Sequence, residues 1–277
     1  MITLAQLPAG HPGRALLTGH TPWFAYQGDP RLSYGLYIPR GGAELEHAEL
    51  LVVVHGSDRR AQLDRDTWAS FGEERNLVIM APLFPVGIDG PDDLDGYKNI
   101  ENAGVRYDLA LFGILDEIRL RWGFDTGRFH LAGHSGGGQF ALRMLLLHPR
   151  RLRGVVISAP GRLTLVDPDS RWPRGTADVA ERFGLRIDTA AIARTPILLS
   201  IGSEDLGAAD LAAQRDPSQD GFGLTRRARL DTLARGLRAL GADPAISIAP
   251  GGTHSAPAGT PAAQEFIGKL LARSPDR

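Results

Sequence analysis

The stretch from Arg128 to Leu147 decides how this chain can fold, and it reads RFHLAGHSGGGQFALRMLLL. Phe129–Ala132 is short and apolar and predicts a buried strand, whereas Gln139–Leu147 predicts an apolar helix. Between them lies GHSGG, residues 133–137, a G-x-S-x-G motif at a strand-to-helix turn. Glycine is needed at such a tight turn because a Cβ would meet neighbouring elements. The turn lifts the Ser135 hydroxyl above the sheet, at a helix N-terminus that favours developing negative charge.

A second pattern overlaps the same stretch. Residues 136–141 read GGGQFA and match the dinucleotide-binding motif G-x-G-x-x-A. That motif requires an acidic residue at the end of the next strand. The next predicted strand, Gly154–Ala159, is followed by Pro160-Gly161 and carries no acid there. The sequence therefore favours a nucleophilic serine over a nucleotide-dependent oxidoreductase.

The composition is that of an ordinary globular protein of 277 residues, 43% hydrophobic and 23% charged. A formal net charge of −1 gives no indication of a nucleic-acid partner. The chain has no cysteine, which excludes disulfides, thiolate metal sites and a cysteine nucleophile. Met1–Arg14 lacks the pattern of a signal peptide, and no apolar run approaches the roughly 18 residues of a membrane span. We expect a cytoplasmic protein with a small-molecule substrate and no nucleic-acid or membrane partner; the oligomeric state stays unknown.

Buried strands alternate with helices along most of the chain. The expected strands are 31–39, an antiparallel edge strand, and 50–54, 77–81, 129–132, 154–159, 196–201 and 245–249. The expected helices are 65–75, 107–121, 139–147, 223–240 and 261–272. The alternation indicates an α/β fold with a mostly parallel, doubly wound sheet covered on both faces. We expect one domain over residues 1–277, in which 162–195 forms a short cap-like insertion over the active site.

Four strand ends carry side chains suited to catalysis, and functional residues collect at such ends in doubly wound sheets. A serine hydroxyl needs a base to take its proton, usually a histidine that a carboxylate orients. In hydrolases built on such sheets, the acid and then the histidine follow the serine in the chain. Of eight histidines, only His148 and His254 follow Ser135, and no acid precedes His148 in the required interval. His254 is therefore the predicted base.

The acid and the oxyanion-binding groups follow from the same reasoning. Glu204 and Asp205 both follow a predicted strand between Ser135 and His254, so both are candidate acids. One oxyanion-binding N–H is expected from Gly136, the residue after the serine. The other should come from the loop after the strand 50–54, which begins His55-Gly56-Ser57, and we expect the N–H of Ser57.

Taken together, these motifs resemble the α/β-hydrolase superfamily from Arg31 to Ala272. The resemblance rests on HG at 55–56, GHSGG at 133–137, GSED at 202–205 and GTH at 252–254. It implies the α/β-hydrolase fold, and it favours Asp205 over Glu204 because an acid three residues after the glycine at 202 recurs in the family. The YIP at 37–39 and the Gly137-Gly138 pair are similar to the branch of feruloyl esterases and polyhydroxybutyrate depolymerases.

The sequence thus predicts a serine hydrolase that cleaves a carboxylic ester through an acyl-enzyme. The predicted triad is Ser135, Asp205 and His254, and Ser57 and Gly136 form the predicted oxyanion hole. Amide, lactone or carbon–carbon bond hydrolases use the same groups, and a non-catalytic small-molecule receptor on this fold is a further alternative.

The substrate pocket and the need for cofactors can be predicted less directly. We expect four side chains to bind the substrate: Phe84, Tyr97, His134 and Trp172. No cofactor and no metal are expected, because imidazole activates the serine and backbone N–H groups hold the oxyanion. The acid-rich loop at 89–95 lacks the spacing of an EF-hand, which favours a solvated loop.

Overall fold

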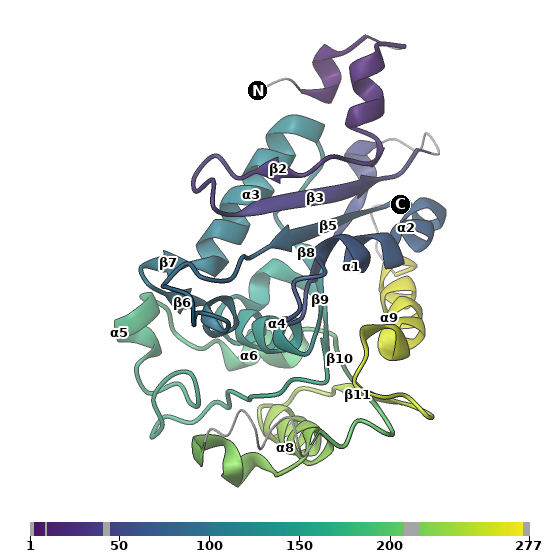
Figure 1. Ribbon diagram of the computed structural model, residues 1–277. Coiled ribbons are helices and arrows are strands. Elements are labelled where there is room, and N and C mark those ends of the chain that lie inside the picture. Colours follow the sequence, from purple (N-terminus) through teal and green to yellow (C-terminus); the bar gives the residue numbers. More distant parts are fainter. Residues whose placement is uncertain (1–2, 9, 41–44, 208–216, 274–277) are drawn as a thin grey trace.

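The computed structural model describes residues 3–8, 10–40, 45–207 and 217–273. In this part of the chain a nine-stranded sheet has the order β1-β3-β5-β4-β8-β9-β10-β11, with β2 also paired to β3 (Figure 1). The strands are β1 (Gly19–His20), β2 (Phe24–Ala25), β3 (Ser33–Ile38), β4 (Glu49–Val54), β5 (Leu77–Leu83), β8 (Phe129–His134), β9 (Leu152–Ser158), β10 (Ile197–Gly202) and β11 (Ala245–Ala249). A separate hairpin joins β6 (Glu101–Asn102) to β7 (Val105–Arg106).

The helices lie between the strands in the sequence. The α-helices are α1 (Ala61–Thr67), α2 (Ala69–Arg75), α3 (Tyr107–Trp122), α4 (Gly136–Leu147), α5 (Val179–Phe183), α6 (Thr189–Arg194), α8 (Arg226–Ala239) and α9 (Ala256–Leu271). Short 3-10 helices are η1 (Leu4–Gln6), η2 (Pro12–Leu16), η3 (Leu45–His47), η4 (Gly96–Asn99), η5 (Pro149–Arg151) and η6 (Pro217–Phe222). Within the described residues, none of these helices is both long and apolar enough to cross a lipid bilayer.

All pairings from β5 to β11 are parallel, so the carboxyl ends of these strands meet at one edge of the sheet. The predicted doubly wound sheet is thereby confirmed. The predicted antiparallel strand β3 does pair antiparallel with β5. It is not the edge strand that we expected, however, because β1 and β2 pair with its outer side.

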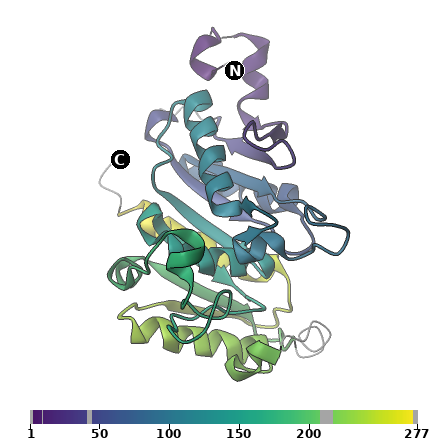
Figure 2. The same cartoon turned by 90° about the vertical axis from the view of Figure 1, so that its left-hand side faces the viewer.

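Strand alternation divides the core into two layers, one on each face of the sheet. In β4, Leu50, Val52 and Val54 pack with α3, α4 and α8, whereas Leu51 and Val53 pack with α1, α2 and α9. Figure 2 looks onto the first of these faces, with α9 behind the sheet. A parallel strand that is covered on both faces needs apolar residues at every position, and β4 supplies them.

Two helices begin more than three residues away from the predicted position. The expected helix at 65–75 is two helices, α1 and α2, which meet at Trp68. The expected closing helix begins five residues early, at Ala256, and Pro261 lies inside it. The prediction puts Pro261 in the first turn, where proline is tolerated, but Pro261 lies in the second turn of α9.

The segment 162–195 packs beside the loop at 95–101. Arg162 pairs with Asp95 at 2.6 Å, and the Trp172 indole N–H donates to Asn99 O at 2.8 Å. Arg143 of α4 is fully buried between the two segments, where it donates to Thr164 Oγ1 at 2.9 Å and to Lys98 O. One guanidinium therefore holds both segments against α4.

Candidate active site

Ser135 occupies the sharp turn between β8 and α4 that its motif predicts. Its φ of 54° and ψ of −111° are strained for a residue with a side chain. A Cβ at position 133 would lie 2.1 Å from Gly137 O, and one at position 137 would lie 2.0 Å from Val54 O. Only glycine fits at these positions, so the backbone of β8 and β4 can approach the turn closely enough to impose its geometry.

His254 lies in the loop after β11 and reaches back to Ser135. The Nε2 atom of His254 is 3.0 Å from Ser135 Oγ, and its Nδ1 atom is 2.7 Å from Asp205 Oδ2. A carboxylate only accepts hydrogen bonds, so Nδ1 carries the proton and Nε2 is left to accept the serine hydroxyl. The structure thus brings together three residues that the sequence separates by 119 and 49 positions.

Asp205 and Glu204, the two candidate acids, point in different directions. The Asp205 side chain is buried, and Arg226 of α8 donates to its second oxygen at 3.1 Å. Burial alone would raise the pKa of Asp205, but the hydrogen bond from His254 and the charges of His254 and Arg226 outweigh it and lower the pKa. Glu204 is exposed and accepts a hydrogen bond from Ser203. Only Asp205 contacts His254.

Arg226 is a site residue that sequence reasoning missed. It begins a basic amphipathic helix, which looks like a solvated outer face in the sequence. Its side chain is nevertheless 5% exposed and contacts the candidate acid. A signal of this kind appears only when α8 is placed beside the end of β10.

The loop at 55–60, which we call the oxyanion loop, places the N–H of Ser57 beside the turn that carries Ser135. A Cβ on Gly136 would lie 3.3 Å from Ser57 N, so the two expected oxyanion-binding residues are neighbours. His55 is fully buried, its Nδ1–H donates to Gly56 O at 2.8 Å, and its Nε2 accepts from Phe84 N at 3.0 Å. Burial lowers the pKa of His55 to about 4, so the ring is neutral and links the loop to β5.

Arg59 fixes the same loop through carbonyl groups. Its guanidinium donates to Ser57 O at 2.7 Å, to Leu94 O at 2.7 Å and to Phe84 O at 3.3 Å. It also lies 4.8 Å from the centre of the Tyr97 ring. A planar group with several donors can hold the peptide that follows Ser57 in one orientation, and the peptide that carries the Ser57 N–H is held at its other end, Gly56 O, by His55.

Three of the four predicted substrate-binding side chains lie inside the core. Phe84 and Tyr97 are at most 1% exposed and pack 5.6 Å apart between ring centres. The Tyr97 hydroxyl donates to His55 O at 3.0 Å, and Trp172, 5% exposed, packs on Phe183. None of the three is among the described residues that line the cavity beside Ser135. A role of these side chains in substrate binding stays a prediction.

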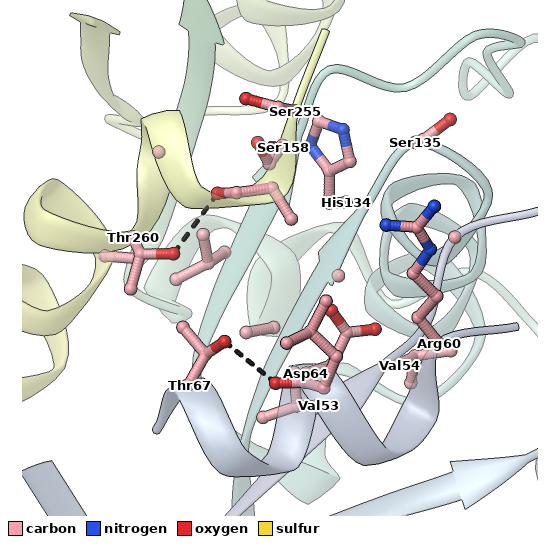
Figure 3. A pocket seen from close by; sticks show the side chains of 18 of the residues that line it. Val53, Val54, Arg60, Asp64, Thr67, His134, Ser135, Ser158, Ser255 and Thr260 are labelled. Atoms are coloured by element: carbon pink, nitrogen blue, oxygen red, sulfur yellow. Dashed lines mark hydrogen bonds between the residues drawn. The ribbon is translucent and has the colours of Figure 1, made fainter. Parts of the chain in front are cut away.

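The cavity beside Ser135 has a volume of about 520 Å³ and lies between α1, α9 and the carboxyl ends of the central strands (Figure 3). The fourth predicted residue, His134, lines it together with His254. His134 Nδ1 is 3.2 Å from Ser158 Oγ, and its ring centre is 4.8 Å from that of His254. Burial, aided by the charge of a protonated His254, lowers the pKa of His134 to about 4, so this ring is neutral.

The described residues contain no cluster of three or more His, Asp or Glu side chains with the geometry of a metal site. In the acid-rich loop, Asp93 Oδ1 accepts from Gly96 N at 2.9 Å, and Asp95 pairs with Lys98 and Arg162. These carboxylates are therefore engaged in fixing the loop.

Comparison with known proteins shows which fold this is. The structure superposes on poly(aspartic acid) hydrolase-1 of Sphingomonas sp. KT-1 with a TM-score of 0.72 and 24% identity, covering 86% of this chain and 93% of that chain. It superposes on LpqC, a poly(3-hydroxybutyrate) depolymerase of Bordetella parapertussis, with a TM-score of 0.69 and 25% identity, covering 87% of each chain. FphF, a fluorophosphonate-binding serine hydrolase of Staphylococcus aureus, has a TM-score of 0.58 and 13% identity over 91% of this chain and 99% of that chain. The chain has the α/β-hydrolase fold, and the predicted resemblance is confirmed.

Comparison of sequences, in contrast to comparison of structures, gives a match over part of the chain. No protein-family model matches the chain. A 2-hydroxy-6-oxononadienedioate/2-hydroxy-6-oxononatrienedioate hydrolase of Cupriavidus pinatubonensis is 31% identical over 120 residues. The match spans 41% of this chain and 37% of that protein.

Proposed function

We propose that this chain is a serine hydrolase that cleaves a carboxylic ester of a small molecule through an acyl-enzyme. The observation that carries the proposal is the hydrogen-bonded series Asp205–His254–Ser135 at the strained turn after β8. Ser135 Oγ attacks the acyl carbon while His254 Nε2 takes its proton, and Asp205 holds His254 in the required tautomer. The N–H groups of Ser57 and Gly136 stabilise the oxyanion.

The second half of the reaction uses the same groups in reverse roles. His254 gives its proton to the leaving alcohol and then takes one from the water that attacks the acyl-enzyme. It passes this proton to Ser135 Oγ as the bond between Oγ and the acyl carbon breaks and the acid leaves. No metal and no cofactor takes part in these steps. We also propose that the segment 162–195 acts as a cap, and the pair of Arg162 with Asp95 holds it against the loop at 95–101.

The experiment that tests the proposal is labelling with a fluorophosphonate probe followed by mass spectrometry. The wild-type chain should be labelled at Ser135, and Ser135→Ala should abolish labelling without a change in melting temperature. Ser70→Ala, at an exposed position of α2, is the matched control and should be labelled normally. Labelling at another serine would refute the assignment, and no labelling at all would favour a non-catalytic receptor.

The bond that is cleaved needs a separate experiment, because amide, lactone and carbon–carbon bond hydrolysis use the same groups. Among these alternatives we test carbon–carbon bond hydrolysis first, because the chain partly matches a hydrolase of a hydroxy-oxo-dienedioate. Rates should be compared for acyl esters of graded length, matched amides and a β-diketone. If the β-diketone is turned over faster than every ester, the bond that the enzyme cleaves is a carbon–carbon bond and not an ester.

A further inference from the structure

The wall of the cavity beside Ser135 changes from apolar to polar along the strands. On the face that α1 and α9 cover, Val53, Ala132 and Val156 form an apolar row. Two residues further along β8 and β9, and at the same level of β10, the row consists of His134, Ser158 and Ser200. Strand residues two apart share a face, so this polar row borders the cavity at the edge of the sheet where Ser135 lies.

Ser200, in this polar row, has a buried hydroxyl group that lacks a hydrogen-bond partner among the described residues. Its side chain is 1% exposed, and it lines the cavity. A buried hydroxyl without a partner is costly, so such a group indicates a place where a ligand supplies the missing hydrogen bond. Gly259 of α9 keeps this place open, because a Cβ there would lie 3.2 Å from Ser200 Oγ and 3.3 Å from Ser158 Oγ.

Asp64 enters the same cavity from the other side. It lies on α1 and points into the cavity opposite Ser158 and Thr260 (Figure 3). No donor among the described residues makes a hydrogen bond to its carboxylate. Asp58 and Arg60 also line the cavity, but they pair with each other at 3.1 Å. With His134 neutral, Asp64 leaves the lining with one net negative charge.

The ionisation of Asp64 agrees with this geometry. Burial raises the pKa of Asp64 to about 6, the nearby Asp58 adds to the effect and Arg60 opposes it. The carboxylate is therefore still charged at neutral pH, although Arg60 offsets only part of the effect of its desolvation.

We propose that this cavity binds the acyl part of the substrate and selects a short acyl chain that ends in a positively charged amine. The proposal rests on the proposed function and names its substrate class. An ammonium group has three donors and no acceptor, and the cavity offers the carboxylate of Asp64 and the hydroxyl of Ser200 as acceptors. An acyl chain that ends in a carboxylate meets the unpaired charge of Asp64 and is rejected.

The test compares ethyl esters that differ only at the far end of the acyl chain. One set contains 3-aminopropanoyl, butanoyl and succinyl esters, and a longer set contains 6-aminohexanoyl, heptanoyl and pimeloyl esters. Within each set an ammonium, a methyl or a carboxylate ends the chain. The wild-type enzyme should prefer the ammonium ester of at least one set over the methyl ester by about 10- to 100-fold in kcat/KM, as expected for a hydrogen bond to a charged group.

Two variants decide whether Asp64 causes the preference. Asp64→Asn should lower the preference for the ammonium ester over the methyl ester at least tenfold, through a higher KM for the ammonium ester, as expected when uniform binding is lost. Asp66→Asn makes the same charge change on α1 outside the cavity lining and should keep the preference. No ammonium preference in the wild-type enzyme, or an equal loss in both variants, would overturn the proposal.

Binding to the Ser135→Ala variant separates this proposal from the proposed function. Calorimetry should show that 6-aminohexanoate binds more tightly than heptanoate and that adding Asp64→Asn or Ser200→Ala weakens only the former. If this binding result is obtained but the wild-type protein hydrolyses no ester, the proposed selectivity of the cavity is supported and the proposed hydrolase function is refuted. Hydrolysis of the methyl esters together with equal binding of the two acids refutes the cavity and supports the hydrolase.

Discussion

Asp205→Asn tests the proposed triad most sharply, because the structure fixes which way the new amide must turn. Arg226 donates to Asp205 Oδ1 at 3.1 Å, so in the variant the amide oxygen stays with Arg226 and the amide NH₂ faces His254. That NH₂ donates to Nδ1, which moves the ring proton to Nε2. His254 then presents an N–H to Ser135 and cannot take the serine proton.

The expected loss of activity in Asp205→Asn follows from this change of the His254 tautomer. The corresponding loss in serine proteases is about 10⁴-fold in kcat, which corresponds to about 5 kcal/mol of transition-state stabilisation. Steady-state hydrolysis of a chromogenic ester measures the loss, and circular dichroism checks that the variant folds. Glu204→Gln is the matched control, since it makes the same chemical change at the adjacent, exposed acid, and it should lower kcat by less than about threefold.

The role of Arg226 can be tested in the same assay. In Asp205→Asn/Arg226→Met the guanidinium no longer holds the amide oxygen, so the amide can turn and accept from His254 Nδ1. The double variant should therefore be faster than Asp205→Asn alone. A single variant that keeps more than a tenth of the wild-type rate, or a larger loss in Glu204→Gln, would refute the reasoning.

Four further predictions concern the turn, the cavity, the oxyanion loop and metals. Gly137→Ala should lower the free energy of unfolding by more than about 3 kcal/mol or prevent folding, since its Cβ would lie 2.0 Å from Val54 O. Gly268→Ala, whose Cβ would lie 3.7 Å from its nearest neighbour, is the control and should leave the melting temperature unchanged or raise it. The raised pKa of Asp64 means that the free energy of unfolding falls as the pH rises from about 4 to about 6, so Asp64→Asn should raise it by up to about 3 kcal/mol at pH 8 and hardly at all at pH 3; an equal effect at both pH values would contradict this. Arg59→Met should lower kcat about tenfold or more with little change in KM, and a change in KM alone would show that the guanidinium binds substrate instead. Chelator should leave the rate unchanged, and a loss that added zinc or calcium restores would refute the metal-free mechanism.

The sequence was sufficient where local pattern and chain order carry the information. Strand β11 has the predicted bounds, and the other predicted parallel strands shift by at most two residues, because apolar runs between turn residues mark them clearly. The chain order of Ser135, the acid and His254 left few combinations, and the structure places Asp205, His254 and Ser135 within hydrogen-bond distance.

What the sequence did not yield depends on contacts across the sheet. Nothing in the local sequence pattern marks Asp64, Ser158 or Ser200 as residues of a site. Their common cavity exists because β8, β9 and β10 align in register and α9 approaches them at Gly259. Helix α1 was displaced by four residues in our prediction, so the position of Asp64 at its start was hidden as well.

The buried Arg143 restricts how the surroundings of this site can diverge or be engineered. Its one cation is shared by the backbone at Lys98 and the hydroxyl of Thr164, in segments far apart in the chain. Exchanging either segment alone for that of another hydrolase removes or shifts one of these two acceptors, and a hydrogen bond to a charged group contributes about 1.5–3 kcal/mol. Grafts should therefore carry the segments 95–101 and 162–174 together, or replace Arg143 by an apolar residue first. In evolutionary terms the two segments form one heritable unit, and viable recombinants will exchange both or neither.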